Sequence, residues 1–132
     1  MFIMKNALLP TLENARKYTL EVAEAMPAEQ YHFKPANGIW SFAELLHHIG
    51  YGIFWWEENF MRQQEGEWAP PAATTTKKAT IAYLKQAFDH LENSPGENEQ
   101  GFHATIDHIT HHRGQATIYL RCQGIEPPTY IY

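Results

Sequence analysis

The sequence predicts an all-α protein that folds as a four-helix bundle of the antiparallel type. Four segments carry apolar residues at the three- and four-residue spacing of an amphipathic helix. Stretches that contain proline and glycine separate these segments, and no stretch alternates apolar and polar residues as a half-buried strand does. A chain of 132 residues is long enough for one hydrophobic core. We therefore assign residues 1–132 to a single domain with mostly short links between its helices.

The first helix is expected from about Lys5 to Met26. Leu12 and Val22 belong to its apolar stripe, Pro10 fits only within a first turn, and Pro27 ends the segment. The loop that follows contains Pro35 and Gly38, which are typical turn residues, and it leads to the start of the second helix.

The second helix has the clearest start signal in the chain. In the stretch WSFAELL, Ser41 is placed as the N-cap and Glu44 as its partner in a capping box. We expect this helix to run to about Gln64, where the proline-containing stretch EGEWAPPAATTT begins.

The third and fourth helices are separated by the turn-forming stretch SPGENEQG. The third is expected from about Lys77 to Asn93 and the fourth from about Phe102 to Gln123. Gly124 directly after the fourth helix is expected to end it, since glycine adopts the left-handed conformation of a helix C-terminus without strain.

Composition and charge exclude several classes of protein. A net charge of −5 argues against a nucleic-acid-binding protein, which usually has a basic face. No apolar stretch approaches the roughly 20 residues that cross a bilayer, and no signal peptide is visible. The single cysteine, Cys122, cannot form an intrachain disulfide and fits a reducing compartment. We therefore expect a cytoplasmic protein that binds neither nucleic acid nor membrane.

Histidines are concentrated in the fourth helical segment, in the stretch DHITHHRGQ. A helix advances about 100° per residue, so His108 and His112 lie about 40° apart on one stripe. This stripe borders the apolar side that contains Ile109 and Ala116, whereas His111 lies on the other side of His108, turned away from the core. His108 and His112 therefore share the spacing with which one helix offers two ligands to a metal ion.

The second helix repeats this pattern, because His48 lies at the edge of its apolar stripe while His47 points further away. Packing the two apolar faces together would bring His48, His108 and His112 to one point. Three neutral imidazoles with a position left for water form an open metal site. The pairs His108 with His111, or Asp107 with His111, remain alternative ligand sets, although they turn from the core.

Four residues near these histidines have candidate roles. Arg113 is expected to form a structural salt bridge or to cap neighbouring carbonyls. Gln115 lies on the metal side of the helix and could orient water or a ligating imidazole. Gly114 is expected to permit close helix packing. Glu44, one turn before His48, could act as a general base, but its capping role already accounts for it.

The stretches WSFAELLHHI and DHITHHRGQATIYLRCQGIEPPTY together resemble the DinB-like (DinB/YfiT-like) superfamily of small four-helix-bundle metalloenzymes. The shared elements are the tryptophan–serine start at Trp40 and Ser41, a histidine at position 48, the H-x-x-x-H-R-G-Q element over residues 108–115, and the segment from Leu120 to Pro128. The resemblance covers most of the chain. It implies that His48, His108 and His112 are the metal ligands.

The resemblance also implies a divalent metal ion, with zinc or nickel expected, and a homodimer. Some members of the family are transferases or isomerases that depend on low-molecular-weight thiols. We accordingly expect a metal-dependent enzyme, either a thiol-dependent transferase or a hydrolase, that acts on a small-molecule substrate. The alternative is a metal- or ligand-binding helical module without turnover. The apolar C-terminal stretch PPTYIY independently favours a dimer, unless it folds back onto its own bundle.

Overall fold

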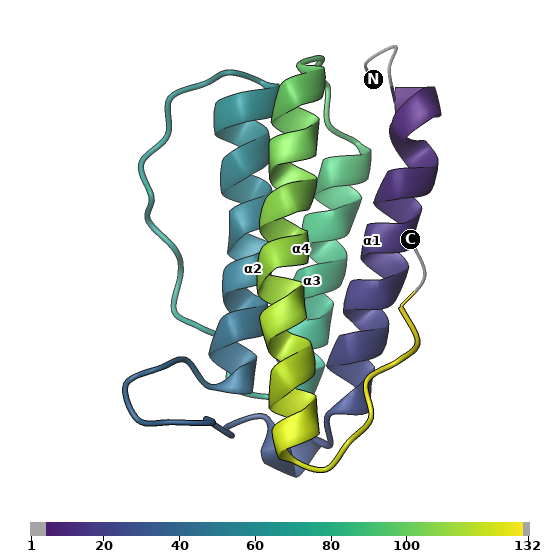
Figure 1. The fold of residues 1–132 in the computed structure, drawn as a ribbon. Coiled ribbons are helices and arrows are strands. Elements are labelled where there is room, and N and C mark those ends of the chain that lie inside the picture. Colours follow the sequence, from purple (N-terminus) through teal and green to yellow (C-terminus); the bar gives the residue numbers. More distant parts are fainter. Residues whose placement is uncertain (1–4, 131–132) are drawn as a thin grey trace.

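The computed structural model describes residues 5–130, which form four α-helices packed side by side (Figure 1). The helices are α1 (Lys5–Ala25), α2 (Phe42–Trp56), α3 (Lys77–Glu92) and α4 (Glu99–Cys122). A 3₁₀ turn, η1 (Ala28–Gln30), follows α1, and a π-helical turn, η2 (Glu57–Met61), continues α2. No strand occurs between residues 5 and 130. The predicted all-α four-helix bundle is confirmed.

The link between α2 and α3 spans the length of the bundle on the outer side of α2 instead of forming a short turn. Residues 62–76 run back along the whole length of α2, so α2 and α3 point in the same direction (Figure 1). This differs from the antiparallel arrangement with mostly short links that we expected. The segment is fastened to α2 where the Tyr51 hydroxyl accepts a hydrogen bond from Ala69 N (2.8 Å) and Trp55 Nε1 donates to the Gly66 carbonyl (3.1 Å).

Side-chain caps and one glycine set the ends of α2 and α4. The predicted capping box is present, because Ser41 Oγ accepts from Glu44 N while Glu44 Oε1 accepts from Ser41 N. Helix α4 begins three residues earlier than expected because Asn98 Oδ1 accepts a hydrogen bond from Gly101 N (2.7 Å). It ends at Cys122, and Gly124 terminates it as predicted, since its φ of +73° is the left-handed conformation of a helix C-terminus.

Two details of the helices differ from the sequence-based expectation. Pro10 lies in the second turn of α1, one turn later than expected. Regular α-helix in α2 ends at Trp56 and not at Gln64. From there a π-helical turn takes over, in which Arg62 N donates to the Glu57 carbonyl five residues earlier (2.9 Å).

The fully buried carboxylate of Glu57 pins this π-helical turn to the end of α3. Its Oε1 accepts from His90 Nε2 (2.5 Å) and from the Arg62 guanidinium (2.8 Å), and its Oε2 accepts from Arg62 Nε (2.6 Å) and Ser94 Oγ (2.7 Å). Burial alone would raise the pKa of Glu57, but the hydrogen bonds from these partners outweigh it and lower the pKa to about 2. The charged carboxylate is thus fully satisfied inside the fold.

The hydrophobic core lies between the four helices. Helix α2 contacts both α3 and α4, and α1 contacts the same two helices from the opposite side. The largest fully buried side chains are Met26 and Tyr31 of the α1–α2 connection, with Phe42, Leu45, Leu46, Ile49, Ile53, Leu84, Phe88, Leu91, Ile109 and Leu120 of the helices. None of the helices between residues 5 and 130 is long and apolar enough to cross a membrane.

Replacing Glu57 by alanine should lower the free energy of unfolding by about 2–3 kcal/mol, because it leaves the half-buried Arg62 and His90 without their carboxylate. The low folded-state pKa of Glu57 means that its contribution is complete above about pH 4.5 and is lost as the pH falls toward 2. Urea denaturation of Glu57→Ala checks this, with the exposed Glu65→Ala as control. Equal effects of the two substitutions would contradict the network's role.

Candidate metal centre

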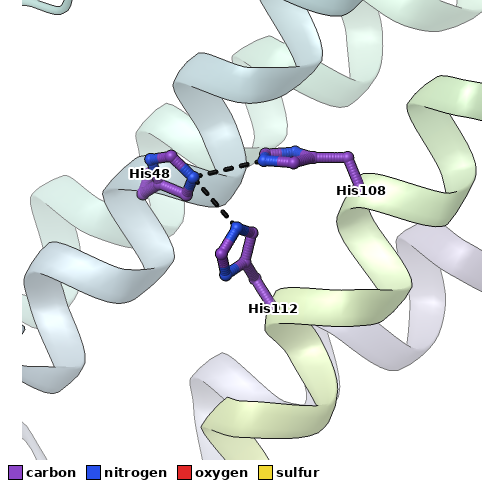
Figure 2. A group of neighbouring side chains, drawn as sticks. All are labelled: His48, His108 and His112. Carbon is purple, nitrogen blue, oxygen red and sulfur yellow. Dashed lines mark hydrogen bonds between the residues drawn. The ribbon is translucent and has the colours of Figure 1, made fainter.

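Three imidazoles meet at the contact between α2 and α4 (Figure 2). His48 Nε2, from α2, lies 3.2 Å from His108 Nε2 and 3.0 Å from His112 Nε2, both from α4. One ligand atom from each residue lies within 4.8 Å of the other two. The two α4 histidines are one helical turn apart, so their side chains stack on the same face and approach His48 together. The structure therefore brings together the three histidines that the stripe analysis selected.

The spacing of these nitrogens fits ligands of a common ion. Two imidazole nitrogens at about 2.05 Å from one ion, at bond angles between about 90° and 110°, lie roughly 2.9–3.4 Å apart. Both short distances, 3.0 and 3.2 Å, fall in this interval. All three rings present Nε2 to the shared point. Nε2 is the nitrogen that remains free to bind a metal ion when Nδ1 serves as a hydrogen-bond donor.

Hydrogen bonding within the protein does not satisfy the three rings. His112 Nδ1 lies 2.8 Å from Gln115 Oε1, an acceptor, so this nitrogen carries the proton and His112 Nε2 presents a lone pair. His48 Nε2 can donate its single proton to only one of the two neighbouring rings. His108 Nδ1 is buried and has no hydrogen-bond partner. A cation at the shared point would accept all three Nε2 lone pairs, which the rings cannot satisfy among themselves in any set of tautomers. It would leave His108 Nδ1, the other nitrogen of that ring, without a partner.

The local environment keeps the imidazoles neutral. Burial, and after it the neighbouring imidazoles, together lower the pKa of His48 to about 4 and that of His108 to about 3. Burial also lowers the pKa of His112, against the effect of its hydrogen bond with Gln115. Only the neutral ring binds a metal ion, so the folded protein offers three ligands that are ready to bind at neutral pH.

Tryptophan side chains pack against the histidines of the triad. Trp56 stacks on His108 with ring centroids 4.2 Å apart and an interplanar angle of 15°. Trp40 packs against His48 at 4.5 Å, and Trp68, from the segment 62–76, packs against the same ring at 5.4 Å. These contacts account for the burial that lowers the histidine pKa values.

Gly52 makes room for His108, and the sequence analysis missed this residue. A Cβ atom at position 52 would overlap His108 Cε1 and lie 2.5 Å from His108 Nδ1, so the imidazole ring would have to shift. Gly52 follows His48 by four residues, on the same face of α2. A glycine one turn after a candidate ligand is the signal that could have identified it.

The remaining histidines of the two clusters lie outside the triad. His111 is exposed, as expected, and so is Asp107. The pairs His108 with His111 and Asp107 with His111 are not part of any group of three or more candidate ligands among residues 5–130. His47 is buried, contrary to the expectation that it points away, because Tyr83 of α3 stacks on its ring at 4.6 Å.

The residues that follow His112 have separate roles. Gln115 orients the His112 ring, which is one of the two roles considered for it. Arg113 is buried and lies over the rings of Tyr18 (4.9 Å) and Tyr130 (5.4 Å), so a cation–π contact replaces the salt bridge expected for it. Gly114 does not serve close packing, since a Cβ atom there would meet nothing within 4 Å. Glu44 caps α2, and the hydrogen bond from Ser41 N lowers its pKa.

The chain is similar to known proteins both in sequence and in fold. A sequence model of the DinB superfamily matches residues 11–94, a span that includes His48 and ends before α4. The crystal structure of a DinB-like protein from Bacillus cereus superimposes with a TM-score of 0.82 over 100% of both chains, at 19% sequence identity. At this identity the likeness establishes the fold. No curated protein matches the chain.

Substituting Gly52 by alanine should weaken binding of a divalent ion about 10- to 100-fold, the range seen when the orientation of a metal ligand is disturbed. The added methyl group must displace the His108 ring. Titration with Zn²⁺ in a calorimeter measures the effect. Gly114→Ala is the matched control: it adds the same methyl group next to the triad in open space and should leave zinc binding unchanged. Equal zinc affinity of Gly52→Ala and the native protein would contradict the placement of His108.

Proposed function

The chain belongs to the DinB superfamily, and on this premise we propose that it is a divalent-metal-dependent enzyme whose ion is held by His48, His108 and His112. The observation that carries the proposal is the convergence of three Nε2 atoms at ligand spacing, whose lone pairs the three rings cannot satisfy among themselves. Zinc and nickel are the ions we propose, since both accept imidazole nitrogen readily.

The residues around the triad would each contribute to such a site. A divalent ion with three neutral ligands keeps its full positive charge and an open position, where it can polarise a carbonyl or lower the pKa of bound water or thiol. Gln115 holds His112 in the tautomer that presents Nε2. Trp40, Trp56 and Trp68 limit access of water, which strengthens electrostatic interactions at this point.

We propose a small-molecule reaction at this centre, either a thiol-dependent transfer or a hydrolysis. A thiol is a suitable partner, because the uncompensated charge of the ion favours an anionic thiolate as an additional ligand. The second candidate function is binding of a metal or ligand without turnover. An assay with small thiols separates the two, since a non-catalytic module would bind the thiol without consuming any substrate.

The proposal also includes the compartment and the oligomeric state of the protein. The lone cysteine, Cys122, is exposed, which fits a reducing cytoplasm. We propose a homodimer on the basis of exposed aromatic side chains such as Phe60 and Trp68. The C-terminal stretch supports this less than expected. Pro128 and Tyr130 lie against Tyr18 of the same chain, and the last two residues lie outside the described range.

Alanine substitution of His48, His108 or His112 should each weaken metal binding by more than about 100-fold, since even the outer hydrogen-bond partners of ligands contribute 10- to 100-fold. Metal content of the purified variants, measured by atomic emission, gives the result. His111→Ala is the control, because this exposed ring neighbours His112 but lies outside the triad. Loss of metal from His111→Ala as large as from the triad variants would show that the wrong face of α4 was chosen.

Removing the metal with a chelator should abolish binding of small thiols while leaving most of the helical signal in circular dichroism. The core lies between all four helices and consists of buried apolar side chains that do not depend on the half-buried triad. The midpoint of thermal unfolding should fall only by the amount that ligand linkage predicts from the metal's affinity. Cooperative unfolding upon chelation at room temperature would instead identify the metal as structural.

A further inference from the structure

A pocket of about 540 Å³ lies beside the triad, between the end of the α1–α2 connection and the C-terminal half of α4. This volume is in the range of sites that take small molecules, roughly 300–1,000 Å³. Its walls include three apolar side chains that are partly open to solvent: Ile39 (42% exposed), Trp40 (42%) and Ile118 (55%). Exposed apolar side chains gathered around a hollow indicate a surface that binds something.

Two polar atoms of this pocket are already engaged within the protein. The Tyr119 hydroxyl donates to the Trp40 carbonyl (2.8 Å), and Gln115 Oε1 is bound by His112 Nδ1. No Asp, Glu, Lys or Arg is among the described residues that line the pocket. A charged group placed there would lose its hydration without gaining a partner, whereas an apolar group would lose only unfavourable contact with water.

The pocket and the triad share a wall. His112 contributes Nε2 to the point where the nitrogens meet and also lines the pocket. The Trp40 ring packs on His48 and His112, with centroids 4.5 and 5.9 Å away, and forms another part of the pocket wall. A molecule bound to an ion at the triad therefore needs only a short extension past Trp40 and His112 to reach the pocket.

We propose that this pocket binds the uncharged, apolar acyl or aryl group of a substrate whose polar head is bound by the ion at the triad. This inference rests on the function proposed above, and it adds the substrate class. The ion selects the reacting head group, while Trp40 and Ile118 select an apolar tail over a charged one.

Hydroxamates of increasing tail length test this proposal, because they share one metal-binding head and differ only in their apolar extension. The protein is loaded with Co²⁺, whose visible spectrum reports both metal binding and ligand exchange, and is titrated with acetohydroxamate and hexanohydroxamate. Each fully buried methylene should tighten binding about fourfold, so even a partly buried tail should gain about tenfold or more. An absence of any gain with tail length would overturn the proposal.

Ile118→Gln locates the tail. It places a neutral polar group in the pocket wall at an exposed position of α4 and should remove most of the tail-dependent gain, while acetohydroxamate binds as before. Ala82→Gln, which puts the same amide on the exposed side of α3 outside the pocket, should keep the gain. A gain that survives Ile118→Gln would place the tail elsewhere and overturn the assignment.

The same titrations separate failure of this inference from failure of the proposed function. If Co²⁺ binds and both hydroxamates bind with equal affinity, the metal site is supported and the proposed binding of an apolar group in the pocket is contradicted. If no Co²⁺ binds at the triad, the proposed function itself is contradicted. A second copy of the chain is the other possible occupant of the pocket, and sedimentation of the native protein and of Ile118→Gln tests for it. Loss of a dimer on this substitution would show that a second copy, and not a substrate, covers the pocket.

Discussion

The close approach of α2 and α4 is the constraint on which the candidate metal centre depends. His48 reaches His108 and His112 only because the two helices lie near enough for their imidazoles to meet, and at Gly52 the His108 ring occupies the space of a missing side chain. The buried apolar faces of the helices drive this contact, with Ile49 and Ile53 on α2 and Ile109 on α4. The same packing that stabilises the bundle therefore positions the ligands.

Much of this arrangement could be predicted because it follows from periodicity along single helices. The 3.6-residue repeat places His108 and His112 on one stripe, and the Ser41–Glu44 capping box fixes the start of the helix that carries His48. These are local properties, and a sequence displays them directly. The family resemblance and the stripe analysis led to the same residues, and the structure brings those residues together.

The features that were missed depend on contacts between segments far apart in the chain. His47 is buried because Tyr83 of α3 covers it, and periodicity within α2 cannot reveal that neighbour. The direction of α3 depends on where residues 62–76 attach to α2, through Tyr51 and Trp55. The early end of regular α-helix at Trp56 reflects the position of Glu57 opposite His90 and Ser94. In each case a tertiary partner decides the outcome.

Glu57, which is fully buried, and the half-buried histidine triad differ in how far the protein itself satisfies their polar atoms. The first group has a structural role, and the second is the candidate functional site. The Glu57 carboxylate loses its hydration but accepts four hydrogen bonds from Arg62, His90 and Ser94, so its charge is stable within the fold. The half-buried imidazoles of the triad lose part of theirs, yet their Nε2 lone pairs converge and cannot satisfy one another. Converging lone pairs that the chain leaves unsatisfied are costly for folding. They are physically understandable as a site that an external cation completes.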